Sequence, residues 1–128
     1  MNKTLLKRIE RNIFLDILEI SDIEFQQIVW LGHCETYISS YVEVMCRLFD
    51  DNKFDLFLDE YTQVLDYTSS FQENLQFLKE NLDSYNKANN KTDLEILNDP
   101  QWNKISKLAK SIINDWPYMA EIVNGIIS

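Results

Sequence analysis

The sequence has few of the residues that interrupt regular secondary structure, with two glycines and two prolines among 128 positions. β-Sandwiches and β-barrels need many turns, and turns favour these two residue types. Their scarcity therefore argues against both folds and favours helices. Apolar residues make up 45% of the chain, which is a globular and not a disordered composition. The length predicts a single domain over residues 1–128, with a core large enough to fold without covalent crosslinks.

The chain also has only two cysteines and one histidine. Cys34 and Cys46 fall in a stretch that we expect to be one helix, which would separate them by about 18 Å, too far for a disulfide. We expect two buried free thiols, as suits a reducing cytoplasm. His33, Cys34 and Glu35 are consecutive, so on a helix their side chains point about 100° apart and cannot converge on one ion. The sequence therefore predicts no metal site and, for the same reason, no Cys–His nucleophile pair.

Long hydrophobic runs are absent as well. No window approaches the roughly eighteen apolar residues that a membrane-spanning helix needs. Met1 is followed by a charged amphipathic pattern and not by the apolar segment of a secretory signal, so we expect a cytoplasmic protein. Basic residues near the N-terminus could favour a membrane surface. Glu10, Asp16 and Glu19 in the same segment would repel an anionic bilayer, which disfavours that alternative.

Apolar residues recur at helical spacing through most of the chain. We expect helices over about 2–20, 22–31, 33–51, 53–67, 71–85, 92–98 and 100–113, and a further short one ending at Gly125. Capping boxes beginning at Ser21, Ser70 and Thr92, and the pair Asp99–Pro100, mark four of the starts. Short connections between such segments predict an all-α fold, an antiparallel helical bundle of about six or seven helices.

The sequence offers no convincing catalytic motif. Asp99-Pro100-Gln101-Trp102 is similar to the D-P-P-Y/W motif of adenine methyltransferases, but a helix start explains these residues and no strand precedes them. Helical nucleotide hydrolases hold Mg²⁺ with E-x-x-E pairs on facing helices, and the nearest spacings here are Asp51/Asp55 and Asp55/Asp59. The chain lacks a matching second cluster and a phosphate-binding glycine loop. We therefore expect a protein that is not an enzyme, with no catalytic residue and no cofactor.

Acidic residues are concentrated in one part of the chain. Residues 12–78 contain thirteen Asp or Glu but only two basic residues, Arg47 and Lys53. This stretch carries a net charge of −11, whereas residues 1–11 carry +3 and residues 79–128 carry −1. The total of −9 therefore originates in the middle of the chain.

The densest acidic segment lies on and just before the helix expected over residues 53–67. On a helical wheel Asp55, Asp59 and Asp66 fall within about 40° of one another, away from the apolar face of that helix. This predicted ridge is flanked by Asp50, Asp51 and Glu60. Like charges one turn apart cost about 0.2–0.5 kcal/mol per pair, so a helix shaped by stability alone would interleave lysines.

A surface this acidic favours a basic protein as its partner, because opposite charges steer the encounter. It repels phosphates, so direct binding to nucleic acid is not expected. Tyr67 and Phe77 could anchor the interface, since aromatic residues are enriched at interface cores. The alternative is a merely solvated face, neutralised in part by lysines elsewhere in the fold. The predicted partner-binding residues are Asp50, Asp51, Asp55, Asp59, Glu60, Asp66, Tyr67 and Phe77.

In size, acidity, helical character and lack of a catalytic motif, the chain resembles the all-helical immunity proteins of bacterial toxin systems, including those of contact-dependent growth inhibition. The resemblance implies a cytoplasmic inhibitor that neutralises a toxin domain, often an RNase or DNase, by covering its cationic nucleic-acid groove. Two alternatives stay open. One is a phage-type DNA mimic or anti-defence inhibitor, and the other is a helical adaptor or secretion chaperone with an apolar groove. The sequence leaves the oligomeric state open.

Overall fold

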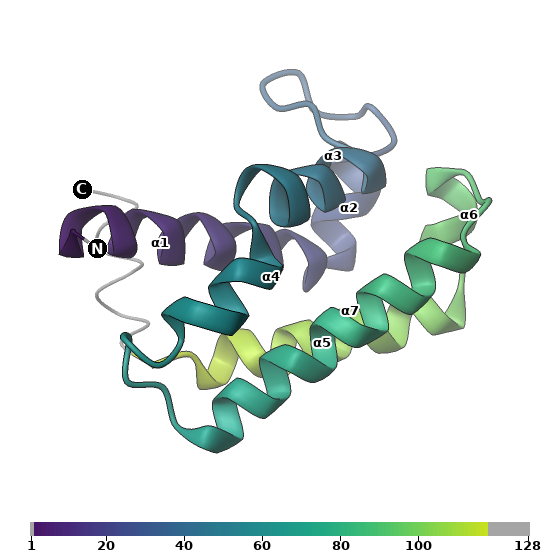
Figure 1. Cartoon of the computed structure of the whole chain (residues 1–128). Helices are drawn as coiled ribbons and strands as arrows, with labels where there is room; N and C mark the ends of the chain where they lie inside the picture. Colours follow the sequence, from purple (N-terminus) through teal and green to yellow (C-terminus); the bar gives the residue numbers. More distant parts are fainter. Residues whose placement is uncertain (1, 118–128) are drawn as a thin grey trace.

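The computed structural model describes residues 2–117, and within that range every regular element is helical (Figure 1). The elements are α1 (Lys3–Ile20), α2 (Ile23–Val29), α3 (Tyr41–Cys46), the π-helical turn η1 (Arg47–Asp51), α4 (Phe54–Leu56), the π-helical turn η2 (Phe57–Tyr61), α5 (Ser69–Ala88), α6 (Asp93–Leu97) and α7 (Pro100–Asp115). The prediction of an all-α helical bundle is confirmed. The predicted last helix, ending at Gly125, lies outside the described residues.

One hydrophobic core joins every element from α1 to α7. The helix α7 packs against both α1 and α5 and so connects the two longest helices of the bundle. At its start Trp102 is fully buried, with its ring centroid 5.4 Å from those of Tyr41 and Tyr85 and 5.9 Å from that of Trp30. Such tilted and edge-to-face pairs add to the free energy gained by burying apolar area. Aromatic packing therefore fixes α3, α5 and α7 together.

Local sequence signals predict some helix starts correctly and others one or two residues off. The capping box of α6 is present, with Thr92 and Glu95 each accepting from the other's backbone N–H. Asp99 caps α7 as predicted, accepting from the backbone N–H of Gln101 at 3.0 Å. The predicted cap of α2 is corrected from Ser21 to Asp22, and the start of α5 moves back to a cap at Thr68. In both cases the side chain of a neighbouring polar residue accepts the hydrogen bond from a free backbone N–H in the first turn of the helix.

The helix expected over 33–51 is wrong in its first half. Gly32 has a φ of 81°, and the bonds His33 N–H to Ile28 C=O and Gly32 N–H to Val29 C=O end α2 in a Schellman pattern. The chain then forms a loop to Ser40, which caps α3 through the amide of Glu43. Ile38, which lies in this loop, is 89% exposed.

The helix expected over 53–67 is also shorter than predicted. Lys53 takes a left-handed conformation (φ 48°) and separates η1 from α4. The bonds Asn52 N–H to Arg47 C=O and Thr62 N–H to Phe57 C=O span five residues, so both turns are wider than an α-helix. After η2 the chain turns and reaches Asp66, which is left-handed as well (φ 59°). A helical wheel with 3.6 residues per turn therefore gives wrong angular positions for the side chains of this segment.

The two cysteines do not share a helix. Cys34 lies in the loop after α2 and is half-buried, whereas Cys46 ends α3 and is exposed. The prediction that both thiols are buried is therefore wrong, although both are free. In residues 2–117 we find no helix with the length and apolar character needed to cross a membrane.

Candidate functional site

An acidic groove of about 430 Å³ opens between the α3–η1 segment and α5. Carboxylates reach it from three elements, namely Asp50 of η1, Asp55 of α4 and Asp83 of α5. The rest of its lining is Tyr41, Val42, Met45, Cys46, Phe49 and Asn86. The groove therefore combines an apolar floor with a negatively charged rim.

Lys79 is the cation that pairs with this rim. Its Nζ lies 3.6 Å from a carboxylate oxygen of Asp55 and 3.6 Å from one of Asp83. Asp50 makes no ion pair within the described residues. One ammonium thus serves two of the three carboxylates, and the groove keeps a net negative charge.

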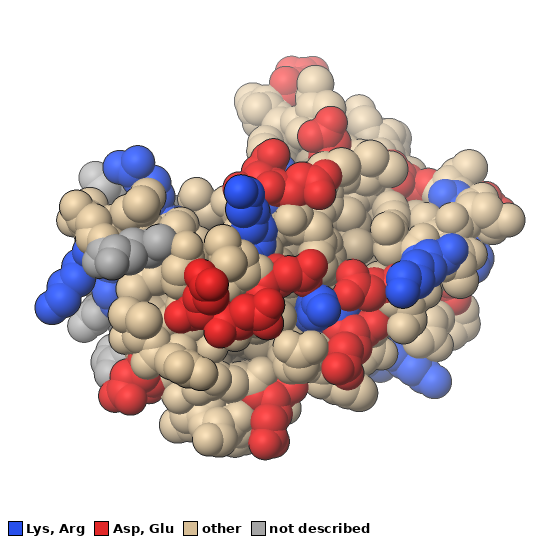
Figure 2. All heavy atoms as spheres, viewed as in Figure 1, with Lys and Arg blue, Asp and Glu red and all other residues tan. Residues whose placement is uncertain are grey.

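The acidic surface continues outside the groove. Asp51, Asp59 and Glu60 are exposed on η1 and η2, and none of them forms an ion pair within residues 2–117. Figure 2 shows Asp and Glu side chains gathered over the middle of the face in view, over α4 and the adjoining part of α5, with few Lys or Arg among them. We call Asp50, Asp51, Asp55, Asp59, Glu60 and Asp83 the acidic surface.

Two of the predicted interface residues lie elsewhere. Asp66 is exposed, but it sits in the left-handed turn after η2 and not on a helix with Asp55 and Asp59, so the predicted ridge does not form as drawn. Tyr67 is only 5% exposed. Its hydroxyl donates to the carboxylate of Glu10, and burial raises its pKa far above the usual value. Tyr67 is a core residue and cannot be a surface anchor.

Phe77 fits the expectation better. It lies on α5 and is 55% exposed. Val64, in the turn after η2, is 68% exposed. Isolated apolar residues on a surface are common, so their exposure alone identifies no interface. They are available as apolar contacts beside an otherwise charged surface.

Sequence reasoning treated Glu10, Asp16 and Glu19 as surface charges, but all three are buried on α1. Glu19 is the best satisfied of them. Its carboxylate accepts from Trp30 Nε1 at 3.0 Å, Ser39 Oγ at 2.6 Å, Tyr37 Oη at 3.2 Å and Arg47 Nη2 at 3.0 Å. These four bonds fasten the end of α2, the loop 31–40 and η1 to α1.

Asp16 completes this buried network. Its carboxylate accepts from Asn52 Nδ2 at 2.6 Å, and the other oxygen lies 3.7 Å from Arg47 Nε. Burial raises the pKa of Asp16 from 3.8 to about 6, against the opposing effects of Asn52 and Arg47. Glu43 lies four residues before Arg47 but makes no ion pair with it, because Arg47 turns inward.

A signal for these buried acids was present in the sequence. Asp16 lies three residues after Ile13 and four before Ile20, inside the apolar stripe of α1. Glu10 likewise lies four after Leu6 and three before Ile13. Asp16 and Glu19, two of the thirteen acidic residues in the stretch 12–78, are therefore buried. Arg47, one of the two basic residues of that stretch, turns toward them. The remaining acids are almost unopposed at the surface.

No group of three or more His, Cys, Asp or Glu in residues 2–117 is arranged to hold a metal ion. No protein-family model, curated protein or solved structure matches the chain. Any statement about function therefore depends on the geometry and charge described above.

Proposed function

We propose that this protein is a cytoplasmic inhibitor of the immunity type, which binds a basic toxin domain, in particular an RNase or DNase. The acidic surface would cover the cationic groove in which such a nuclease holds its nucleic acid. The observation that carries the proposal is the set of exposed carboxylates around an apolar-floored groove, with Lys79 as its paired cation. Opposite charges would steer the two proteins together and orient them.

The groove has the chemistry to hold a lysine or arginine side chain of that partner. The aliphatic part would pack on Val42, Met45 and Phe49, while the charged end would reach Asp50 and Asp55. Lys79 already pairs with Asp55 and Asp83, so Asp50, which makes no ion pair within the described residues, is the rim carboxylate that the partner's cation would reach first. Phe77 on α5 would add an apolar contact. Steering would raise the association rate, and the groove would slow dissociation.

Purification of the partner is the first test. A tagged form of the chain is expressed in the cells of its origin, and co-purifying proteins are identified and produced separately. We expect a basic protein that degrades RNA or DNA, and we expect equimolar addition of this chain to stop that activity. A partner without basic character, or a nuclease that stays fully active in the complex, would contradict the proposal.

A second candidate function, a helical adaptor or secretion chaperone, has one observation in its favour. Leu15, Leu18, Phe25 and Tyr37 line a mainly apolar groove of about 360 Å³ on α1, α2 and the following loop. Leu15 and Leu18 are 37% and 39% exposed, so this groove presents apolar area to solvent. Salt separates the two functions, because electrostatic binding weakens as ionic strength rises and apolar binding does not.

A further inference from the structure

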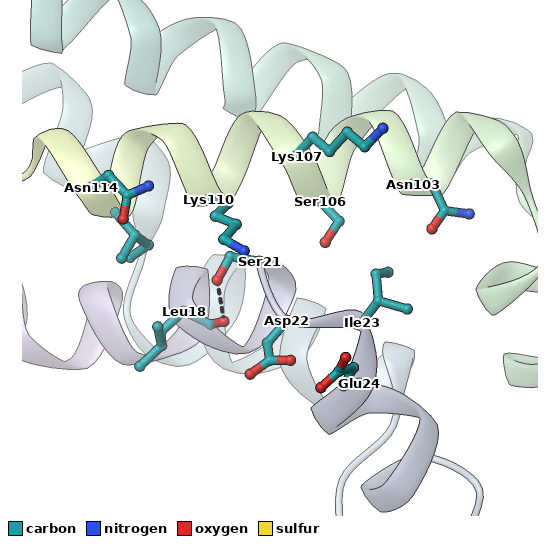
Figure 3. A pocket seen from close by; sticks show the side chains of 11 residues that line it. Leu18, Ser21, Asp22, Ile23, Glu24, Asn103, Ser106, Lys107, Lys110 and Asn114 are labelled. Atoms are coloured by element: carbon teal, nitrogen blue, oxygen red, sulfur yellow. Dashed lines mark hydrogen bonds between the residues drawn. The ribbon is translucent and has the colours of Figure 1, made fainter.

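A second cleft, of about 520 Å³, opens between the α1–α2 junction and α7 (Figure 3). It shares no lining residue with the acidic groove. Its character also differs, because it combines basic, acidic, neutral polar and apolar side chains. Nothing in the proposed inhibitor function uses it.

The α7 wall of the cleft carries hydrogen-bond donors. Lys107 and Lys110 line it, and neither pairs with a carboxylate within the described residues. Ser106 is 3% exposed, and its hydroxyl points from α7 into the cleft without a hydrogen-bond partner in residues 2–117 (Figure 3). Asn103 points the same way. The Ser106 hydroxyl can therefore donate a hydrogen bond to a ligand in the cleft.

The opposite wall carries negative charge. Asp22 and Glu24 lie together at the start of α2 (Figure 3), and neither is paired with a cation in the part of the chain that the structure describes. Asp22 accepts the amide of Phe25 at 3.0 Å through one oxygen, which leaves the other oxygen available. The apolar part of the lining comes from both walls, with Leu18 and Ile23 on the α1–α2 side and Ile113 on α7.

We propose that this cleft binds a free α-amino acid with an apolar side chain. The carboxylate of the amino acid would meet Lys110 and Ser106, its ammonium would meet Asp22 and Glu24, and its side chain would cover Leu18, Ile23 and Ile113. A simple anion is disfavoured by the two carboxylates and by the net charge of −9. A simple cation is disfavoured by the two lysines. A zwitterion meets a group of opposite charge on each wall.

Titration of the full chain with L-leucine tests the proposal, followed by ¹H–¹⁵N correlation spectra. Three analogues each remove one feature: 4-methylpentanoate lacks the ammonium, 3-methylbutylamine lacks the carboxylate, and glycine lacks the apolar side chain. We expect saturable shifts at Ser106, Lys110 and Ile23, with each analogue at least about tenfold weaker than leucine. The proposal is overturned if leucine, isoleucine, valine, methionine and phenylalanine at roughly 10 mM all leave these resonances unchanged. Equal binding of leucine and an analogue would overturn it as well.

Three variants place the ligand in the cleft. Lys110→Gln removes the cation, Ser106→Ala removes the hydroxyl, and Asp22→Asn removes the charge while keeping a residue that caps α2. Each is expected to weaken leucine binding by about fivefold or more. Lys104→Gln changes an exposed lysine of α7 that does not line the cleft, and it should leave the affinity unchanged. Equal effects of Lys104→Gln and Lys110→Gln would contradict the site. Because no variant touches the acidic surface, failure here leaves the proposed inhibitor function unaffected.

Discussion

Arg47 Nη2 lies 3.0 Å from Glu19 Oε1, and this ion pair ties η1 to α1 through the edge of the core. The side chain of Arg47 is 29% exposed, whereas that of Glu19 is 7% exposed. The same guanidinium also lies 3.7 Å from Asp16 and donates to Tyr37 and Ser39. One arginine therefore compensates two buried carboxylates and positions the start of the acidic surface.

Replacing Arg47 by methionine should destabilise the fold strongly. The methionine keeps most of the side-chain volume, but it leaves Asp16 and Glu19 buried without a cation. We expect a loss of about 3 kcal/mol in the free energy of unfolding, measured by urea denaturation. Arg8→Met is the matched control, because Arg8 is exposed on α1 and should cost less than about 0.5 kcal/mol. Equal effects of the two changes would show that the buried network contributes little.

Asp16 should make stability depend on pH in a characteristic direction. Its pKa is about 6 in the fold against 3.8 for the ordinary group, so the fold favours the protonated form. The stability that this preference contributes is fully present below about pH 4 and is lost as the pH rises through about 6. The change amounts to about 3 kcal/mol at 1.36 kcal/mol per pKa unit.

The Asp16 prediction is measured as a difference between two proteins. Urea unfolding of the wild type and of Asp16→Asn is followed between about pH 4 and pH 7, so that other carboxylates cancel. The stability of the wild type relative to the variant should fall as the pH rises. A difference that stays constant over this range would mean that Asp16 titrates as an ordinary surface carboxyl.

Tyr67→Phe separates a core role from an interface role. The change removes the hydroxyl that donates to Glu10 and should cost about 1–3 kcal/mol of stability by thermal or urea unfolding. Affinity for the partner should stay unchanged, since Tyr67 is buried. Tyr61→Phe is the control, because Tyr61 is half-buried and its hydroxyl has no partner within residues 2–117. If the Tyr67→Phe variant loses affinity for the partner but keeps its stability, Tyr67 belongs to the interface and this prediction is wrong.

Both thiols should be reactive in the native state. Cys46 is exposed, and a hydrogen bond from Thr36 lowers the pKa of Cys34. We expect a disulfide reagent to modify two thiols without denaturant at about pH 7, because Cys46 is exposed and the lowered pKa of Cys34 favours its thiolate. Single Cys34→Ser and Cys46→Ser variants assign the two modified thiols. If the thiols react only after the protein is unfolded, both cysteines are buried and this prediction is wrong.

Most of the fold was accessible from local patterns. The helices expected over 2–20, 71–85 and 100–113 correspond to α1, α5 and α7, because apolar residues at helical spacing indicate a buried helix face. The start of α7 at Pro100 was also found, since Asp99 and proline act within one turn. These features need no knowledge of distant residues.

What the sequence could not supply depends on contacts between distant segments. Asp16 and Glu19 can be buried because the positive charge of Arg47, about thirty residues later, lies beside both carboxylates. Local sequence patterns do not predict an ion pair between segments so far apart. The π-helical turns changed the angular positions of Asp59 and Glu60, and the left-handed residues removed Asp66 from the ridge. Asp83 was missed because the groove joins α4 to α5 only in the folded protein. The acidic character was predictable, but its location was not.

The affinity for the purified partner, measured by calorimetry at roughly 50 and 500 mM NaCl, tests the central claim most directly. We compare the wild type with the triple variant Asp50→Asn, Asp59→Asn and Glu60→Gln. A control triple variant, Glu35→Gln, Glu73→Gln and Asp115→Asn, makes the same charge change at exposed sites outside the acidic surface.

Binding through the acidic surface predicts that the first triple variant loses at least about tenfold in affinity at low salt, while the control loses less than about threefold. The wild type should also weaken steeply at high salt, and the first variant less so. Affinities that agree within about threefold among all three proteins and at both salt concentrations would contradict the account.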